Sequence, residues 1–227
     1  MKKFAIVTGS SQGLGLSLVN YLLDEDYIVF GASRGGTPVQ HGNLIDIICD
    51  IRRESDVESM FEEIDQMTNE IHLVINNAGI CRIDPIDETA TSDFQDHLQT
   101  NVTGVFHVLK HLKPYLVENE THIINISSKA GIKGISNWSA YCASKFGLEG
   151  LVAACREEWK SMKIKFTNLR PGAINTGLWQ RLGIEVPENE VMEVGEFLKV
   201  FDIVIKSEKV LSFNDLSFSH HMNQQYE

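Results

Sequence analysis

The sequence predicts an α/β fold in which one parallel β-sheet is covered by helices on both faces. From residue 4 to residue 170, short apolar runs suited to buried strands alternate with amphipathic stretches suited to helices. The first run, Phe4 to Val7, leads through a glycine-rich turn into a helix that begins near Leu14. The 227-residue chain has no linker, repeat or low-complexity tract, so we expect residues 1–227 to form a single domain.

The later elements follow from the same alternation. Further strands are expected over residues 27–33, 44–49, 71–75, 122–126 and 164–169. Apolar residues at helical spacing predict helices over 57–67, 92–117 and 139–160, with Pro114 disturbing the end of the second. The last 50 residues are less regular, and we expect a helix over 186–205 and an edge strand over 210–218 there.

The turn after the first strand has the composition of an anion-binding site. Gly9, Gly13 and Gly15 lack the Cβ atoms that would hold a pyrophosphate away from the backbone. The N-terminus of the following helix directs its N–H groups and positive dipole to the same place. An ordinary tight turn between a strand and a helix is the alternative.

Unusual loops also follow the other strands. Because ligands of parallel sheets bind beyond the carboxyl ends of the strands, these loops predict one shared site. The residues concerned are Gly9 to Gly15, Arg34, Asp50, Asn77 to Gly79, Ser128 and Pro171-Gly172.

Arg34 predicts a preference for NADP(H), with NAD(H) less favoured. In dinucleotide folds, an acid about 20 residues beyond the glycines binds the ribose hydroxyls of NAD. Here Ser33 stands 18 residues beyond Gly15, and Arg34 follows it. A guanidinium can bind a 2′-phosphate through two charge-assisted hydrogen bonds, whereas a solvated loop arginine is the alternative. We expect Asp50 to accept from the adenine amino group, with Ile51 against the ring.

Tyr141 and Lys145 stand at positions i and i+4 of one predicted helix, so they share a face. Lowering a phenol pKa from about 10 to about 7 requires ~4 kcal/mol. A cation ~4 Å away supplies a similar energy at an effective dielectric constant of ~20. Ser128, at the end of a strand, is suited to hold a carbonyl oxygen as negative charge develops on it.

Taken together, these residues resemble the motifs of the short-chain dehydrogenase/reductase family, in its compact single-domain branch. The matches occur in the family's order: Thr8 to Gly15, Asp50, Asn76 to Gly79, Asn101, Ser128, Tyr141-x3-Lys145 and Pro171 to Thr176. The resemblance implies a Rossmann-type sheet and hydride transfer to or from the nicotinamide ring.

The resemblance also implies four catalytic roles. Tyr141 would be the general acid in reduction and the base in oxidation, and Lys145 would lower its pKa and hold the nicotinamide ribose. Ser128 would orient the substrate carbonyl, and Asn101 would position a water that links Lys145 to solvent. Thr8 would brace the turn through Asn77 to Gly79. The expected cofactor contacts are Gly9, Ser11, Gln12, Gly13, Leu14, Gly15, Arg34, Asp50, Ile51, Asn77, Ala78, Gly79, Tyr141, Lys145, Pro171, Gly172, Ile174 and Thr176.

The chain departs from the family pattern at Gln12 and in the substrate lid. Gln12 stands where many NADP(H)-using relatives carry a basic residue, so the expected phosphate preference rests on Arg34. The substrate lid, about residues 176–190, is shortened, which predicts an open site for bulky or varied carbonyls.

Trp138 and Trp179 flank the expected site and either line the substrate cleft or pack in the core.

Composition limits the partners. The net charge of −11 disfavours nucleic acid and anionic membrane surfaces, and no apolar run reaches the ~18 residues of a membrane span. The four cysteines and the pair His220-His221 lack metal-ligand spacing, so we expect reduced thiols and no metal. No leader precedes the first strand, which predicts a cytoplasmic protein. The two long helices form the family's usual dimer surface, and the resemblance therefore implies a homodimer or homotetramer.

The sequence thus favours an NADPH-dependent reductase that converts a ketone or aldehyde to an alcohol. Two alternatives stay open. The same residues would serve an NAD(P)-dependent alcohol dehydrogenase that works in the oxidative direction. The chain could also be a non-catalytic NADP(H)-binding sensor, although such proteins usually lose the tyrosine or the lysine.

Overall fold

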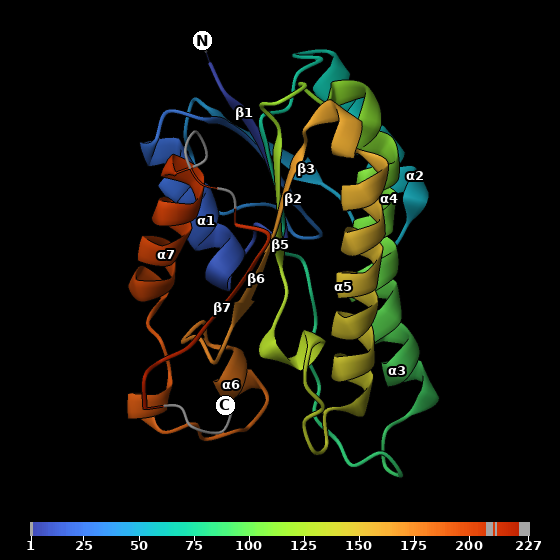
Figure 1. Ribbon diagram of the computed structural model, residues 1–227, viewed down its shortest axis with the longest axis vertical. Coiled ribbons are helices and arrows are strands. Elements are labelled where there is room, and N and C mark those ends of the chain that lie inside the picture. The colour runs from blue at the N-terminus through green and yellow to red at the C-terminus, as the bar shows by residue number, and fades with distance from the viewer. Residues whose placement is uncertain (1, 208–210, 212, 223–227) are drawn as a thin grey trace.

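The computed structural model describes residues 2–207, 211 and 213–222, and its centre is a seven-stranded sheet between two layers of helices (Figure 1). The strands lie in the order β3-β2-β1-β4-β5-β6-β7, and every neighbouring pair is parallel. Their bounds are β1 Phe4–Thr8, β2 Ile28–Ser33, β3 Leu44–Ile48, β4 Leu73–Asn76, β5 His122–Ile126, β6 Lys165–Pro171 and β7 Asp215–Phe218. The predicted Rossmann-type, doubly wound parallel sheet is confirmed.

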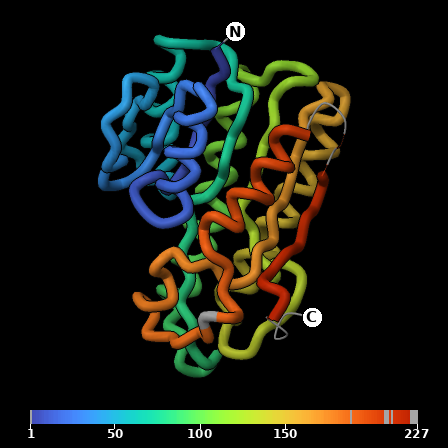
Figure 2. The backbone as a smooth tube through the Cα atoms, turned by 90° about the vertical axis from the view of Figure 1, so that its left-hand side faces the viewer, coloured from blue at the N-terminus to red at the C-terminus, as the bar shows by residue number. Residues whose placement is uncertain are grey.

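The helices divide between the two faces of the sheet (Figures 1 and 2). One face carries α1 (Gly13–Asp24) and α7 (Val194–Lys206), and the other carries α2 (Glu54–Asp65), α4 (Gly104–Leu112) and α5 (Ser139–Glu158). Side chains of a strand alternate between faces. Accordingly, Ile6 of β1 packs with the α2, α4 and α5 layer, whereas Ala5 and Val7 pack with α1 and α7.

Strand order reverses between β1 and β4. From β1 the chain builds β2 and β3 outward on one side, then returns to place β4 on the other side of β1. Loops that leave β1 and β4 therefore diverge, and such a switch point is where ligands of open α/β sheets bind. The fold thus places the glycine-rich turn and the loop that begins with Asn77 next to each other.

The helical stretch predicted over 92–117 is present, with Pro114 in its last turn as predicted, but the type of helix changes along it. The segment consists of α3 (Thr91–Leu98), a π-helical stretch (Gln99–Thr103), α4 and a 3-10 turn (Lys113–Tyr115) that contains Pro114. The π-helical stretch carries Asn101. Such stretches occur frequently at functional sites, because the extra residue changes where side chains point.

The C-terminal part also differs from prediction. The helix expected over 186–205 begins only at Val194, where the side chains of Glu193 and Glu196 form a capping box. Before it come a four-residue helix, α6 (Leu178–Arg181), and a 3-10 turn over 188–190. Of the edge strand expected over 210–218, residues 215–218 form β7, whereas residues 210 and 212 lie outside the described residues. Within the described ranges, no helix has the length and hydropathy needed to span a bilayer.

Candidate active site

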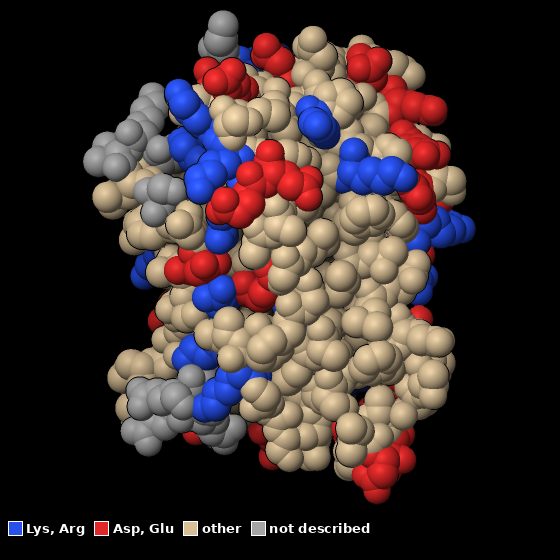
Figure 3. Space-filling model, turned by 45° about the vertical axis from the view of Figure 1, so that its right-hand side comes forward, with Lys and Arg blue, Asp and Glu red and all other residues tan. Residues whose placement is uncertain are grey.

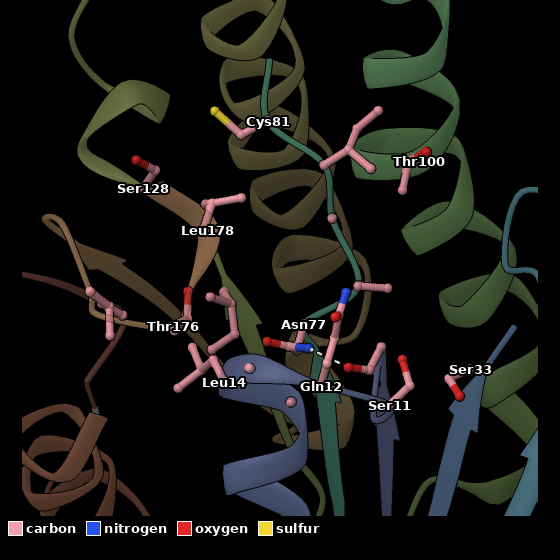
Figure 4. A pocket seen from close by; sticks show the side chains of 18 of the residues that line it. Ser11, Gln12, Leu14, Ser33, Asn77, Cys81, Thr100, Ser128, Thr176 and Leu178 are labelled. Carbon is pink, nitrogen blue, oxygen red and sulfur yellow. Dashed lines mark hydrogen bonds between the residues drawn. The ribbon is translucent and has the colours of Figure 1, made fainter. Parts of the chain in front are cut away.

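A cleft of about 790 Å³ opens over the carboxyl ends of the strands. All the residues predicted to contact a cofactor line it, and so do Ser128, Tyr141 and Lys145 of the four predicted catalytic residues. Figure 4 shows the cleft from Ser33 at one end, past Gln12 and Leu14, to Ser128 and Cys81 at the other. The fourth residue, Asn101, is buried and lies outside the lining.

The glycine-rich turn packs closely against the loop after β4. A Cβ atom on Gly15 would overlap the carbonyl oxygen of Gly9 and would lie 2.5 Å from Nδ2 of Asn77. Gly9 adopts φ +70° and Gly13 adopts φ +55°, which disfavour residues with a side chain. Because α1 begins at Gly13, its N-terminus faces the cleft that this turn lines. The turn thus fits a phosphate that approaches the backbone closely.

Hydrogen bonds fix the two loops at the switch point to each other. Oγ1 of the buried Thr8 accepts from the backbone N–H groups of Asn77 and Ala78, each at 3.1 Å. Nδ2 of Asn77 donates to the carbonyl oxygens of Thr8 at 2.9 Å and Gly9 at 3.2 Å. Thr8 therefore braces the loop after β4, as the resemblance implied.

One end of the cleft carries two arginines. The side chain of Arg34 is exposed, lines the cleft and forms no ion pair with any residue that the structure describes. Asp50 accepts from Nε of Arg52 at 2.9 Å and from Nη2 at 2.6 Å, so this guanidinium holds the pKa of Asp50 below its usual range, with Arg34 adding to the effect. Arg52 was not among the predicted site residues, although its position two residues after Asp50 was a signal.

The other end holds the predicted catalytic pair on one face of α5. Nζ of Lys145 lies 5.7 Å from the centroid of the Tyr141 ring and donates to the carbonyl oxygen of Ile126 at 2.8 Å. The Lys145 side chain is buried, and this burial lowers its pKa to about 8, against the opposing effects of Cys81 and Glu149. The geometry thus places a buried ammonium next to the phenol ring.

Asn101 links the loop after β4 to α5. Its Oδ1 accepts from the backbone N–H of Ile80 at 2.8 Å, and its Nδ2 donates to the Ile80 carbonyl and to Oγ of Ser144, each at 2.9 Å. A Cβ atom on Gly79 would lie 3.2 Å from Oδ1 of Asn101 and 3.8 Å from Nζ of Lys145. Gly79 therefore lies over both side chains, and Asn101 holds the loop that covers Lys145.

The two serines after β5 have different surroundings. Ser127 is buried and donates to Oε1 of Glu149 at 2.6 Å. Glu149 also accepts from Nδ2 of Asn168 and from the guanidinium of Arg170, which forms an ion pair with it at 2.8 Å. Ser128 is half-buried, and its Oγ accepts from the backbone N–H of Ala130 at 3.1 Å. Of the two hydroxyls, only that of Ser127 is bound to this carboxylate.

Trp138 and Trp179, which the sequence allowed either in the substrate cleft or in the core, both line the cleft. Trp138 precedes α5 and Trp179 lies on α6, and their ring centroids are 6.0 Å apart. Several other lining residues were not predicted, because none belongs to a motif: Cys81, Arg82, Thr100, Leu178 and Arg181.

Several known proteins are similar in sequence to this chain. The model of the family described as short chain dehydrogenase matches residues 3–186. A 3-oxoacyl-[acyl-carrier-protein] reductase of Bos taurus is 30% identical over 210 residues, which cover 89% of this chain and 88% of that protein. An NADPH-dependent pterin aldehyde reductase of Arabidopsis thaliana is 34% identical over 184 residues, 76% of this chain and 75% of that one.

Solved structures have the same fold. The alcohol dehydrogenase of Thermococcus sibiricus, in complex with 5-hydroxy-NADP, gives a TM-score of 0.87 at 19% identity and covers 99% of this chain and 98% of its own. The 3-ketoacyl-(acyl-carrier-protein) reductase of Brucella melitensis, in complex with NADH, gives 0.86 at 20% identity and covers 97% and 98%. The chain belongs to the short-chain dehydrogenase family. The two reductases to which its sequence is similar are oxidoreductases.

Proposed function

We propose that this protein is an NADPH-dependent carbonyl reductase that converts a ketone or aldehyde to an alcohol, with Tyr141 as the general acid. One observation carries the proposal. Tyr141, the buried Lys145 and Ser128 lie at one end of a cleft, and the glycine-rich turn and Arg34 line the same cleft. A nicotinamide dinucleotide fits this arrangement, because the turn accepts a phosphate and the cleft spans the switch point.

Each residue has a separate task in the proposed reaction. When bound, NADPH supplies the hydride that reduces the carbonyl carbon. The Ser128 hydroxyl donates a hydrogen bond to the carbonyl oxygen, where negative charge develops. The Tyr141 hydroxyl gives its proton to that oxygen, which leaves a phenolate that the Lys145 ammonium stabilises. Asn101 holds the loop over Lys145 and positions the water through which the proton is replaced.

Arg34 supports NADPH over NADH. Neither Ser33, at the end of β2, nor Arg34 after it supplies the acid that binds the ribose hydroxyls of NAD, and Arg34 has no carboxylate partner among the described residues. Solved structures with this fold hold 5-hydroxy-NADP or NADH, so the fold accommodates both kinds of cofactor. Arg34 also favours the reductive direction over an NAD(P)-dependent alcohol dehydrogenase. The presence of both Tyr141 and Lys145 favours an enzyme over a sensor.

We also propose that residues 176–190 form a short lid over the substrate end. It contains α6, with left-handed glycines at Gly177 (φ 73°) and Gly183 (φ 67°) on its two sides.

We also propose a cytoplasmic location, which the four free cysteines support. Imaging of a fluorescent fusion tests it, and export of the fusion from the cell would contradict it.

Replacement of Tyr141 by Phe removes the proton donor and keeps the ring. We expect kcat for reduction across a panel of ketones and aldehydes to fall by about 10²- to 10⁴-fold. The loss of NADPH absorbance measures the rate. Tyr115→Phe is the matched control, because the Tyr115 hydroxyl donates to the carbonyl of Phe61 in the core, away from the cleft. Equal turnover by wild type and Tyr141→Phe would refute the mechanism.

Reduction should also depend on the charge of Lys145. Below its pKa of about 8 the buried side chain is an ammonium, and the charge is lost as the pH rises through that value. We therefore expect kcat/KM for reduction to decline above about pH 8, measured with NADPH saturating. A profile that stays flat to pH 10 would contradict this role for Lys145.

Arg34→Asp should change cofactor choice. Loss of charge-assisted hydrogen bonds to the 2′-phosphate should lower the ratio of kcat/KM for NADPH to kcat/KM for NADH by roughly 10- to 100-fold. Arg53→Gln is the control, because Arg53 is exposed and does not line the cleft. If the ratio stays the same in Arg34→Asp, the proposed phosphate contact is wrong.

The homodimer or homotetramer stays a proposal, supported by an apolar face. Phe106 on α4 and Phe146 on α5 are exposed, and the side of the molecule with these helices has a broad area without charged residues (Figure 3). Phe146→Glu should shift the molar mass in light scattering towards the monomer. Ile203→Glu, on the exposed side of α7 in the other helical layer, should leave it unchanged. A wild-type monomer would rule out the assembly.

A further inference from the structure

Three aromatic rings follow one another at the substrate end of the cleft. The Tyr141 and Trp138 ring centroids are 5.6 Å apart with the planes nearly perpendicular, at 70°. Trp138 and Trp179 follow at 6.0 Å and 38°. These separations are those of favourable aromatic pairs, so an added ring can join the row at a similar distance.

The two indoles differ from the chain's third tryptophan in their surroundings. Trp159 is 7% exposed and packs against Phe166 in the core, 5.6 Å between centroids. Trp138 and Trp179 are each only half-buried and line the cleft. Their apolar surface is therefore not used up by the core, and it lies in a cleft where a ligand can cover it.

Trp179 is held in place by the backbone around it. Its Nε1 donates to the carbonyl oxygen of Ile174 at 3.1 Å, which satisfies the one polar atom of the indole. Its own carbonyl accepts from the backbone N–H groups of Leu182 and Ile184. Near the base of the lid, Met192 forms a β-bridge with Ile174. The ring is thus fixed before any ligand binds, so little side-chain entropy is lost on binding.

Apart from Arg181 on α6, which forms no ion pair with any residue that the structure describes, the surrounding wall carries little free charge. Burial raises the pKa of the Cys81 thiol to about 12, which keeps it neutral. Arg82 is neutralised by ion pairs with Asp93 and with Asp96. Leu178, next to Trp179 on α6, adds another apolar side chain to the lining. The chemistry of this wall suits a flat apolar group better than a charged or heavily hydroxylated one.

We propose that Trp138 and Trp179 bind an aromatic ring attached directly to the reacting carbonyl, which makes aryl aldehydes and aryl ketones the preferred substrates. This rests on the carbonyl reductase function proposed above. The carbonyl of such a compound is coplanar with its ring. Contact with the two indoles therefore also fixes which face of the carbonyl is reduced, and a prochiral aryl ketone should give mainly one enantiomer of the alcohol.

The test compares benzaldehyde with cyclohexanecarbaldehyde, two aldehydes whose six-membered rings differ in aromaticity. Trp138→Leu and Trp179→Leu should each lower the ratio of kcat/KM for benzaldehyde to that for cyclohexanecarbaldehyde by about five- to tenfold. Trp159→Phe is the control and should leave the ratio unchanged. With acetophenone, the enantiomeric excess should fall in Trp179→Leu. An unchanged ratio in both cleft variants would overturn the proposal, and this includes the case in which kcat/KM falls equally for both aldehydes.

A binding measurement separates this proposal from the enzymatic function. Benzaldehyde added without NADPH should quench tryptophan fluorescence of the wild type saturably, and the quenching should weaken in both cleft variants. If no carbonyl in the panel is reduced but saturable quenching persists, the reductase function falls and the aromatic subsite stands. If the wild type shows no saturable quenching, the subsite is refuted whatever the enzyme reduces.

Discussion

The hydrogen bonds between Thr8 and the segment Asn77-Ala78 are the contact on which the site depends. They join the loops of β1 and β4, two strands that are neighbours in the sheet although far apart in sequence. Loops at a switch point diverge, so nothing in the sheet itself keeps them together. The amide of Asn77 returns two hydrogen bonds to the β1 turn, and this is possible only because Gly15 has no side chain there. The floor of the cleft is therefore one unit built from two distant parts of the chain.

Much of the fold and the site followed from local patterns. In a parallel sheet, the carboxyl ends of all strands meet at one edge, so residues that follow different strands had to converge. This is why the predicted cofactor contacts line a single cleft. The long helix of residues 139–160 was also predicted to within about two residues, because its apolar spacing is regular.

The remaining features depend on contacts that no local pattern encodes. The π-helical stretch around Asn101 accompanies hydrogen bonds to Ile80 and close packing of Gly104 against Ile51. The late start of α7 follows from the bridge between Met192 and Ile174, which keeps Met192 out of the helix. The sequence likewise could not show whether Trp138 and Trp179 line the cleft or pack in the core. They are 41 residues apart and meet only in the folded chain.

The position of β7 has a practical consequence for anyone who handles this protein. The strand pairs with the end of β6, the backbone N–H of Gly172 donates to the carbonyl of Phe218, and Lys129 donates to the Ser219 hydroxyl. Phe218 thus supports the Pro171-Gly172 loop, and Ser219 supports Lys129, the neighbour of Ser128. Chain added ahead of β1 instead emerges at the opposite edge of the sheet (Figure 1). A purification tag or immobilisation linker placed ahead of β1 therefore lies away from the residues that support the cleft.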